Sequence, residues 1–385
     1  MTALLGHVAE INPRKPRTLD SAGLCSFVPM EYVDDVSGAI VQTAVRKVQE
    51  VEKGYTYFGD GDILFAKITP CMENGKCALA QGLQNGVGFG STEFHVVRSG
   101  NKVLPIWVYY FLRQESVRQE AARQMTGSAG QQRVPTRFLE EVEIPLPPLE
   151  EQQRIAEVLA RADRLRRLRR AARERSAGYL QAVFLQMFGD PVENPMGWEF
   201  QKLHNLASSV DYGVTASASR EPIGPKFLRI TDIQDGVVDW DSVPYCSASG
   251  KEKRGSMLQK SDIVFARTGA TTGKSYLIQD CPEGAVFASY LIRVRPNQKI
   301  DPVYLSIYFQ TDAYWKQIQE SSTGTAQAGV NATKLKQLRV LIPPLPLQQR
   351  FAGVVRRFER LRAQQVEAER QAEALFQALL ARAFM

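Results

Sequence analysis

Apolar and polar positions follow two different periods along the chain. Short apolar stretches at 63–66 and 94–97, separated by Gly and Asn, predict β-strands. The segment 104–123 gathers Trp, Tyr, Phe and Leu on one face before it turns polar, and it predicts one helix. Alternating apolar positions at 142–146 lead into prolines and predict an extended segment. A first folded domain is therefore expected to end near residue 149.

Two longer segments have helical spacing. From 150 to about 188 apolar residues recur with coiled-coil spacing, which predicts a helix roughly 55 Å long. A second long helix is predicted at 347–383. Neither helix can bury its apolar stripe alone, so we predict that the two pack on each other, antiparallel, as a rod. The alternative is that each helix packs on its own domain. The stripe of the second helix consists of Phe351, Val354, Val355, Phe358, Leu361, Leu375, Phe376, Leu379 and Leu380.

These elements occur twice. The segment 62–67, Asp-Ile-Leu-Phe-Ala-Lys, returns at 262–267 as Asp-Ile-Val-Phe-Ala-Arg. The junction at 147–154, with Pro-Pro-Leu and then Gln-Gln-Arg, returns at 343–350. This period is far longer than the roughly 20–50 residues of stacked repeats, so a whole domain and its following helix are duplicated.

Weaker matches place the rest of the second copy. Residues 227–230 align with 27–30, and 286–294 align with 88–96, which sets Phe287 against Phe89. The segment 302–319 repeats the aromatic-rich helix. We predict an α+β protein in which two similar α/β domains are joined by two long helices that form an antiparallel coiled coil, with pseudo-twofold symmetry. The predicted parts are 1–149 (domain), 150–190 (helix), 191–346 (domain) and 347–385 (helix).

Composition adds a basic balance. A formal net charge of +7 and a pI near 9.1 favour a polyanionic partner. The five cysteines form no Cys-x-x-Cys pair and the three histidines are scattered, which argues against a zinc site and a disulfide framework. With no signal peptide and no apolar run long enough to span a membrane, we expect a cytoplasmic protein with reduced thiols.

Several segments resemble catalytic motifs without matching them. Residues 268–275 resemble a phosphate-binding loop, but Thr268 stands where the pattern needs glycine. We interpret the repeated Gly-Lys pair as a turn with an exposed lysine. The spacing from Asp62 to Lys67 resembles a metal nuclease, yet no further carboxylates gather there. Neither Pro-Pro pair precedes an aromatic residue, as an amino-methyltransferase loop would require. The chain is therefore predicted to be a non-enzyme.

Hydrogen-bonding residues concentrate in two loops of each copy, at 69–76 and 126–133 and at 267–274 and 323–331. Arg and Lys suit guanine, Asn and Gln suit adenine, and all can hold phosphates. The alternative is that these are ordinary solvated turns. The candidate DNA-binding residues are Lys67, Thr69, Asn74, Lys76, Ser128, Gln131, Gln132, Arg133, Arg267, Thr268, Thr271, Thr272, Lys274, Thr325, Gln327 and Asn331.

An arginine run on the first long helix allows three interpretations. It could be a solvated helix face, a surface toward DNA, or a surface for acidic patches on a partner. The run consists of Arg161, Arg164, Arg166, Arg167, Arg169, Arg170, Arg173 and Arg175.

The segments 61–67 and 91–94, and above all the junction at 144–155, resemble the specificity subunit of type I restriction–modification systems. The second junction at 342–350 resembles the same motif but lacks the Glu before its glutamines. The resemblance covers essentially the whole chain. It implies two target recognition domains, each recognising one half of a bipartite site in double-stranded DNA.

The resemblance also implies what the helices and partners do. The helices would set the spacer between half-sites and dock two modification subunits, which carry S-adenosylmethionine. Restriction subunits that use ATP and Mg would join them, so no cofactor is expected in this chain. We place partner contacts at Gln153, Arg154, Gln349 and Arg350. Two alternatives are a fused restriction–methylation enzyme and a coiled-coil scaffold that recognises no bases.

Overall fold

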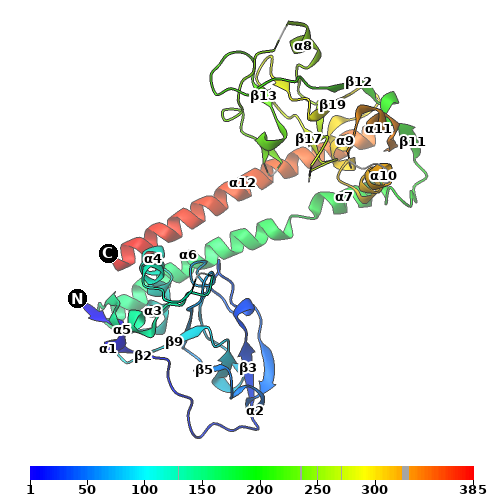
Figure 1. The fold of residues 1–385 in the computed structure, drawn as a ribbon. Helices are drawn as coiled ribbons and strands as arrows, with labels where there is room; N and C mark the ends of the chain where they lie inside the picture. Colours follow the sequence, from blue (N-terminus) through cyan, green and yellow to red (C-terminus); the bar gives the residue numbers. More distant parts are fainter. Residues whose placement is uncertain (129, 235, 249, 270, 323–328) are drawn as a thin grey trace. The chain divides into compact units, whose positions relative to one another are not determined.

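The computed structural model describes residues 1–385 apart from 129, 235, 249, 270 and 323–328. The chain divides into two compact units (Figure 1). Unit 1 comprises residues 1–173 and 365–385, and unit 2 comprises residues 174–364. Each unit therefore contains one mixed α/β domain together with part of the long helical segments.

Unit 1 begins with strands and short helices and continues into longer helices. Its strands are β1 (Thr2–Leu4), β2 (Ala9–Ile11), β3 (Leu24–Val28), β4 (Ala44–Lys47), β5 (Thr56–Gly59), β6 (Ile63–Ala66), β7 (Cys77–Leu79), β8 (Val87–Gly90), β9 (Phe94–Ser99) and β10 (Glu143–Pro145). Its helices are α1 (Leu5–Val8), α2 (Val48–Val51), α3 (Pro105–Leu112), α4 (Glu115–Arg123), α5 (Thr136–Glu141) and α6 (Leu149–Arg175), joined by the last part of α12 (Leu345–Phe384).

The core of unit 1 is layered around the sheet ordered β2-β9-β6-β7. Ile63 and Phe65 on one face of β6 pack with the helices, whereas Leu64 on the other face packs toward the second sheet, ordered β4-β3-β8-β5. Successive strand residues point to opposite faces, and both faces of β6 are covered. The repeated segment is for this reason an uninterrupted apolar run rather than an alternating one.

Unit 2 repeats the main part of this order, but two separate two-stranded sheets replace the four-stranded second sheet of unit 1. Its strands are β11 (Glu199–Lys202), β12 (Ala207–Tyr212), β13 (Phe227–Leu228), β14 (Ile233–Gln234), β15 (Val237–Val238), β16 (Ile263–Ala266), β17 (Ser275–Leu277), β18 (Val286–Phe287), β19 (Leu291–Pro296) and β20 (Arg339–Ile342). Its helices are α7 (Tyr179–Phe188), α8 (Gly250–Gly255), α9 (Pro302–Tyr308), α10 (Asp312–Ser322), α11 (Ala332–Gln337) and the first part of α12.

The sheet ordered β12-β19-β16-β17 is the counterpart of the first sheet of unit 1. Ile263 and Phe265 belong to the core beneath the helices, and Val264 belongs to the core on the opposite face. The same strand segment is thus buried in the same way in both units. The predicted duplication and the α+β class are confirmed.

The strand register corrects one predicted alignment. Phe65 pairs with His95 in unit 1, whereas Phe265 pairs with Ile292 in unit 2. Since β6 corresponds to β16, His95 corresponds to Ile292, and the alignment of Phe89 with Phe287 is wrong by one residue. The connection from β16 to β18 is one residue shorter than the sequence match implied. The structural counterpart of Glu93 is accordingly Tyr290.

Three segments that the sequence predicted as single helices are each two helices. The first domain has α3 and α4, because Gln114 is extended and its side chain donates to the Phe111 carbonyl. The second has α9 and α10, where the Thr311 hydroxyl donates to the Tyr308 carbonyl. The predicted helix at 150–188 is α6 and α7, which are separated by a turn that ends at Gly178.

In unit 1, α6 and the end of α12 run antiparallel. Arg166 pairs with Glu373, and Arg173, further along α6, pairs with Glu369 (Figure 1). Residue numbers therefore rise along α6 in the direction in which they fall along α12. Leu159 of α6 and Phe376 of α12 also join the core of the domain. The predicted helix pairing and its alternative, packing on the domain, therefore both occur in this unit.

In unit 2, α7 and the start of α12 pack in the same antiparallel sense. Tyr179 stacks on Phe358 with ring centroids 5.1 Å apart, and the Phe184 ring centroid lies 5.6 Å from that of Phe351. Phe184 and Phe351 are also part of the domain core.

Two residues predicted as members of the apolar stripe do not belong to it. Leu361 in unit 2 and Leu375 in unit 1 are each about half exposed. The stripe of α12 is therefore buried toward the two ends of the helix, where each domain contributes to its environment.

Candidate nucleic-acid interface

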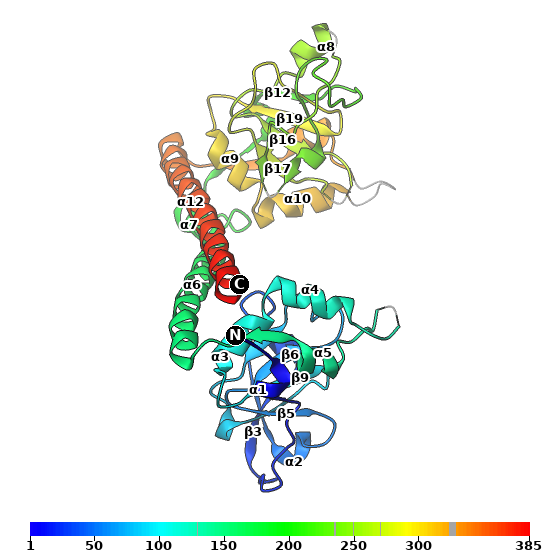
Figure 2. The same ribbon diagram turned by 90° about the vertical axis from the view of Figure 1, so that its left-hand side faces the viewer.

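In unit 1 the two predicted loops lie together at the end of β6. The Thr69 amide donates to the Gln132 carbonyl at 3.0 Å, and the Val134 amide donates to the Lys67 carbonyl at 2.8 Å. The loop that begins at residue 126 follows α4 and projects from the domain (Figure 2). We call residues 67–76, 93, 126–128 and 130–133 the polar edge of unit 1.

Several side chains of this polar edge face solvent. Asn74 is exposed, and Lys67 and Thr69 are half-buried. Thr69 donates its hydroxyl hydrogen to Glu73 at 2.5 Å. The further exposed candidates are Ser128, Gln131 and Gln132. The polar edge therefore presents amides, hydroxyls and an ammonium group, which are the groups that bind base edges and phosphates.

Arg133 forms an ion pair with Glu93. Its Nη2 atom lies 2.8 Å from Glu93 Oε1, and its Nε atom also donates to Glu93. The hydrogen bonds from Arg133 lower the pKa of the Glu93 carboxyl. The pair presents a donor and an acceptor side by side, with the Arg133 side chain 41% exposed.

Lys76 has a different environment from its counterpart. Its ammonium group donates to the carbonyls of Met30 at 3.0 Å and Val33 at 2.8 Å, so it holds the segment after β3. Lys274 in unit 2 is exposed. The exposed lysine expected in this turn is therefore found in unit 2, whereas Lys76 is engaged within unit 1.

In unit 2 Arg267 makes the same two backbone bonds as Lys67, whose amide donates to the Glu93 carbonyl and whose carbonyl accepts from the Val134 amide. The Arg267 amide donates to the Tyr290 carbonyl at 3.0 Å, and the Val330 amide donates to the Arg267 carbonyl at 3.0 Å. Thr268 and Lys274 are exposed, and Thr271 and Thr272 are half-buried. We call residues 267–269, 271–274, 290 and 329–331, with Tyr212, the polar edge of unit 2.

Two other candidates of unit 2 are already engaged in local bonds. The Asn331 side chain accepts from the Lys334 amide and caps α11, and the Thr272 hydroxyl donates to the Gly269 carbonyl. Thr325 and Gln327, which were also predicted to contact DNA, lie outside the described residues.

Sequence reasoning missed two tyrosines of this polar edge. Tyr212 is 41% exposed and Tyr290 is 66% exposed, and the Arg267 guanidinium lies 5.1 Å from the centre of the Tyr212 ring. Both tyrosines lie outside the two loops predicted for this copy, 267–274 and 323–331, and no pattern in the sequence marked them.

The repeated aspartates are structural. Asp62 accepts from the Gly59 amide and binds Arg98 through two hydrogen bonds, of 2.8 and 2.6 Å. Asp262 accepts from the Gln259 amide and binds Arg295 in the same way. These carboxylates, which gave 62–67 its likeness to a nuclease motif, are thus engaged in ion pairs with arginine.

The repeated glutamine pair has one buried and one exposed member. Gln152 is fully buried, accepts from the Leu104 amide, and donates to the carbonyls of Lys102 and Pro147. Gln348 is also fully buried and binds Asp301 and Pro343.

The predicted partner contacts are the exposed neighbours of these glutamines. They are Gln153, Arg154, Gln349 and Arg350. Gln153 lines a pocket of about 550 Å³ beside Pro105, and Gln349 lines one of about 510 Å³ beside Pro302. Arg154 pairs with Glu151 at 2.6 Å while remaining 68% exposed.

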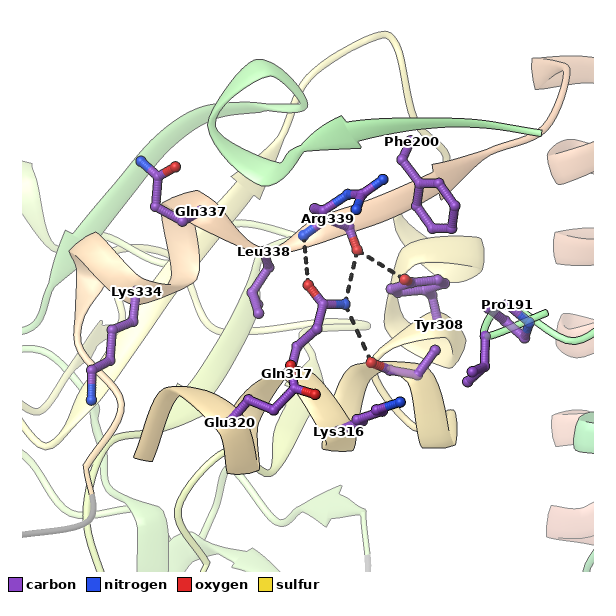
Figure 3. Close-up of a pocket in the computed structure, with 12 residues that line it drawn as sticks. Pro191, Phe200, Tyr308, Lys316, Gln317, Glu320, Lys334, Gln337, Leu338 and Arg339 are labelled. Carbon is purple, nitrogen blue, oxygen red and sulfur yellow. Dashed lines mark hydrogen bonds between the residues drawn. The ribbon is translucent and has the colours of Figure 1, made fainter. Parts of the chain in front are cut away.

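A further pocket of unit 2, of about 570 Å³, lies beside α10 and β20 (Figure 3). Gln317 accepts from the Arg339 amide and donates to its carbonyl, to which the Tyr308 hydroxyl also donates. These bonds fasten α9 and α10 to β20. Lys316, Glu320 and Lys334 also line this pocket, so its lining carries charged groups of both signs.

The arginine run on α6 divides into buried and exposed members. Arg166 is buried: it binds Asp163, Glu373 and the Val36 carbonyl, and its guanidinium lies 4.4 Å from the centre of the Phe376 ring. None of the three predicted roles describes it, because it connects two helices and a loop within unit 1. The exposed members are Arg161, Arg164, Arg167, Arg169, Arg173 and Arg175.

The described part of the chain lacks two kinds of feature. Within it, no three His, Cys, Asp or Glu side chains are grouped so that they could hold a metal ion. Among the same residues, no helix is long and apolar enough to cross a membrane.

The two copies of the repeated sequence match a known family. A model of the type I restriction modification DNA specificity domain matches residues 4–174 and again residues 195–373. The chain therefore belongs to this family and carries the domain twice. The resemblance identified from the repeated junctions is confirmed.

Individual relatives match parts of the chain. The EcoAI specificity subunit of Escherichia coli is 42% identical over 152 residues, which cover 39% of this chain and 26% of that protein. The EcoKI specificity subunit of Escherichia coli strain K12 is 26% identical over 271 residues, covering 63% and 57%. The chain spans about a quarter of the length of the EcoAI and EcoEI subunits.

Solved structures show the same fold over the full chain. A structure from work on the assembly and conformational transition of the type I R-M system superposes with a TM-score of 0.61 at 22% identity, covering 100% of this chain and 97% of that one. The S subunit of a type I system from M. genitalium gives a TM-score of 0.57 at 14% identity, covering 100% and 96%.

Proposed function

We propose that this chain is the DNA sequence-specificity subunit of a type I restriction–modification complex. Each unit recognises one half of a bipartite site in double-stranded DNA through its polar edge. The observation that carries the proposal is the duplication itself: one backbone frame presents two polar edges of different composition. A target with two different half-sites needs such a pair of recognition surfaces.

Charge and side-chain chemistry support DNA as the partner. The chain carries a formal charge of +7, and its polar edges combine cations with amides and hydroxyls. Cations attract the phosphate backbone, and planar side chains recognise base edges in the major groove. Engagement of Asp62 and Asp262 in ion pairs supports recognition rather than cleavage as the task of the repeated motif.

The remaining activities belong, in this proposal, to partner subunits. Two modification subunits dock near the exposed residues Gln153, Arg154, Gln349 and Arg350 and carry S-adenosylmethionine. Restriction subunits supply ATP hydrolysis with Mg. The helix pairs set the distance between the two half-sites, and this chain contributes no catalytic residue.

The deciding experiment is methylome sequencing of a host strain with and without this gene, with the neighbouring modification gene expressed in both. We expect a bipartite adenine-methylated motif with a fixed gap that disappears on deletion. If the methylome is unchanged on deletion, the chain is instead a scaffold that recognises no bases. Methyl transfer by the purified chain alone would instead indicate a fused enzyme.

A further inference from the structure

The two polar edges occupy the same frame but differ at two linked positions. Lys67 and Arg267 receive equivalent backbone bonds, from Val134 and Val330, and their amides bind the carbonyls of Glu93 and Tyr290. Tyr290 therefore stands where unit 1 has Glu93. By the same bonds Gly329, which precedes Val330, stands where unit 1 has Arg133.

The polar edge of unit 1 therefore has an ion pair where the polar edge of unit 2 has aromatic rings. In unit 1 the carboxylate of Glu93 holds Arg133 and offsets its charge. In unit 2 the ring of Tyr212 holds Arg267 instead, with the guanidinium 5.1 Å from the ring centre. A ring supports the face of a guanidinium and leaves its in-plane N–H donors available, whereas a carboxylate occupies two of them.

The position of Tyr212 is itself fixed. Its hydroxyl accepts from the Ala332 amide at 3.0 Å, which ties the end of β12 to the start of α11. Tyr290 immediately precedes β19 and is 66% exposed, although a tyrosine ring usually buries much of its surface. A fixed cation beside an exposed ring is the combination that contacts bases: arginine binds guanine O6 and N7, and apolar surface contacts the thymine methyl group.

We propose that Arg267 and Tyr290 contact bases of the second half-site and set its sequence, and that Tyr212 is a positioning residue for Arg267. Arg267 binds a guanine, and Tyr290 contacts the neighbouring base pair. In the same way, the Glu93–Arg133 pair contacts bases of the first half-site and sets its sequence. This inference rests on the proposed function and adds the residues that make the two half-sites different.

The test uses the chain in complex with its cognate modification subunit and measures methylation of a DNA library in which every position of the motif is varied. We expect Y290A and R267K each to lose discrimination by about 10- to 100-fold at one or two positions of one half-site, with the other half-site and the gap unchanged. E93Q is the reciprocal variant and should alter the opposite half-site only.

Tyr212 is tested by a matched pair of variants. Y212F keeps the ring and loses only the bond to Ala332, so it should lose less discrimination at the guanine position than Y212A, while circular dichroism reports an unchanged fold for both variants. An effect of equal size in both variants would show that the ring itself does not support Arg267, and unchanged discrimination in both would show that Tyr212 does not position Arg267.

Two outcomes overturn the assignment of base contacts. An unchanged motif in Y290A and R267K would show that neither residue contacts a base. Uniformly weaker methylation of every sequence would show phosphate contact alone. Either result would leave the proposed function standing, provided that the wild-type complex methylates a bipartite motif. A wild-type complex without such a motif would refute the proposed function and this inference together.

Discussion

Asp62 is a carboxylate whose role depends on its partner. It immediately precedes β6, where it binds Arg98 and the Gly59 amide, and its side chain is 2% exposed. D62N would leave Arg98 without a charged partner. Because the Arg98 side chain is 35% exposed, water offsets part of the loss, and we expect the free energy of unfolding to fall by roughly 2 kcal/mol.

Chemical denaturation measures this cost. The matched control is E141Q, which removes an ion pair to Arg137 between side chains that are 79% and 55% exposed. E141Q should leave the unfolding midpoint where it is. Equal midpoints for D62N and the wild type would mean that the repeated aspartate does not stabilise the fold, and its occurrence in both units would need a functional reason.

His95 gives a prediction about pH. Burial lowers its pKa from the ordinary 6.5, and its Nε2 atom donates to the Val134 carbonyl at 2.8 Å. Well above pH 6.5 the ring is neutral in both the folded and unfolded chain and contributes nothing to the pH dependence. Below 6.5 the unfolded chain takes up a proton that the folded chain does not, so stability falls as pH falls.

The measurement is the urea midpoint of the wild type and H95Q from pH 7 to pH 5. The wild type should lose more stability than H95Q over this range, by up to about 1.4 kcal/mol per pH unit. H7Q, which changes an exposed histidine, is the control and should follow the wild type. Parallel pH profiles for the wild type and H95Q would contradict the prediction.

At the residue scale, sequence reasoning found the polar loops but not which side chains are engaged. Nothing in the sequence distinguishes Lys76, which binds two carbonyls, from the exposed Lys274. That difference depends on the chain segment after β3, distant in sequence. Long-range contacts of this kind also made Arg166 a buried connector within a run of mostly exposed arginines.

At the scale of elements, the start of each long helix is fixed by a buried glutamine. Gln152 binds the Leu104 amide and two carbonyls. Q152A would leave these buried groups without partners, at a cost of about 2–4 kcal/mol. We expect a lower denaturation midpoint for Q152A.

The neighbouring residue provides the control. Gln153 is exposed, so Q153A should retain the wild-type midpoint. If Gln153 contacts a modification subunit as proposed, Q153A should weaken assembly of the complex without changing stability, which analytical ultracentrifugation would detect. Equal stability of Q152A and Q153A would contradict the anchoring role of Gln152.

Element type was predictable because apolar periodicity is local, whereas element ends were not. Gln114 and Thr311 interrupt helices through side-chain hydrogen bonds to nearby carbonyls. A polar residue within a helical pattern does not indicate in the sequence whether it will form such a bond. The one-residue error between β16 and β18 arose because a loop can change length without changing the apolar pattern on either side. Register depends on pairing between strands, which only the structure supplies.

At the scale of the whole molecule, α12 runs unbroken from Leu345 to Phe384 and contributes to both units. A continuous helix suits the proposed role of setting the gap between half-sites. Lengthening the helix directly after Arg154 would be a poor test, because Leu159 and Ala162 belong to the core of unit 1. Insertions beyond Arg173 and Gln364, where the units divide, avoid that core.

We expect four residues inserted at both places to lengthen the gap by one or two base pairs. Four inserted residues add about 6 Å and rotate the continuing helix by about 40° beyond one full turn. One base pair adds about 3.4 Å and about 34°. Both half-sites should keep their sequence, because neither polar edge is altered. Methylome sequencing would measure the length of the gap. Insertion into one helix alone should abolish methylation, because the two helices would no longer be in register with each other. A motif that persists with its original gap would show that the helices do not determine the spacing.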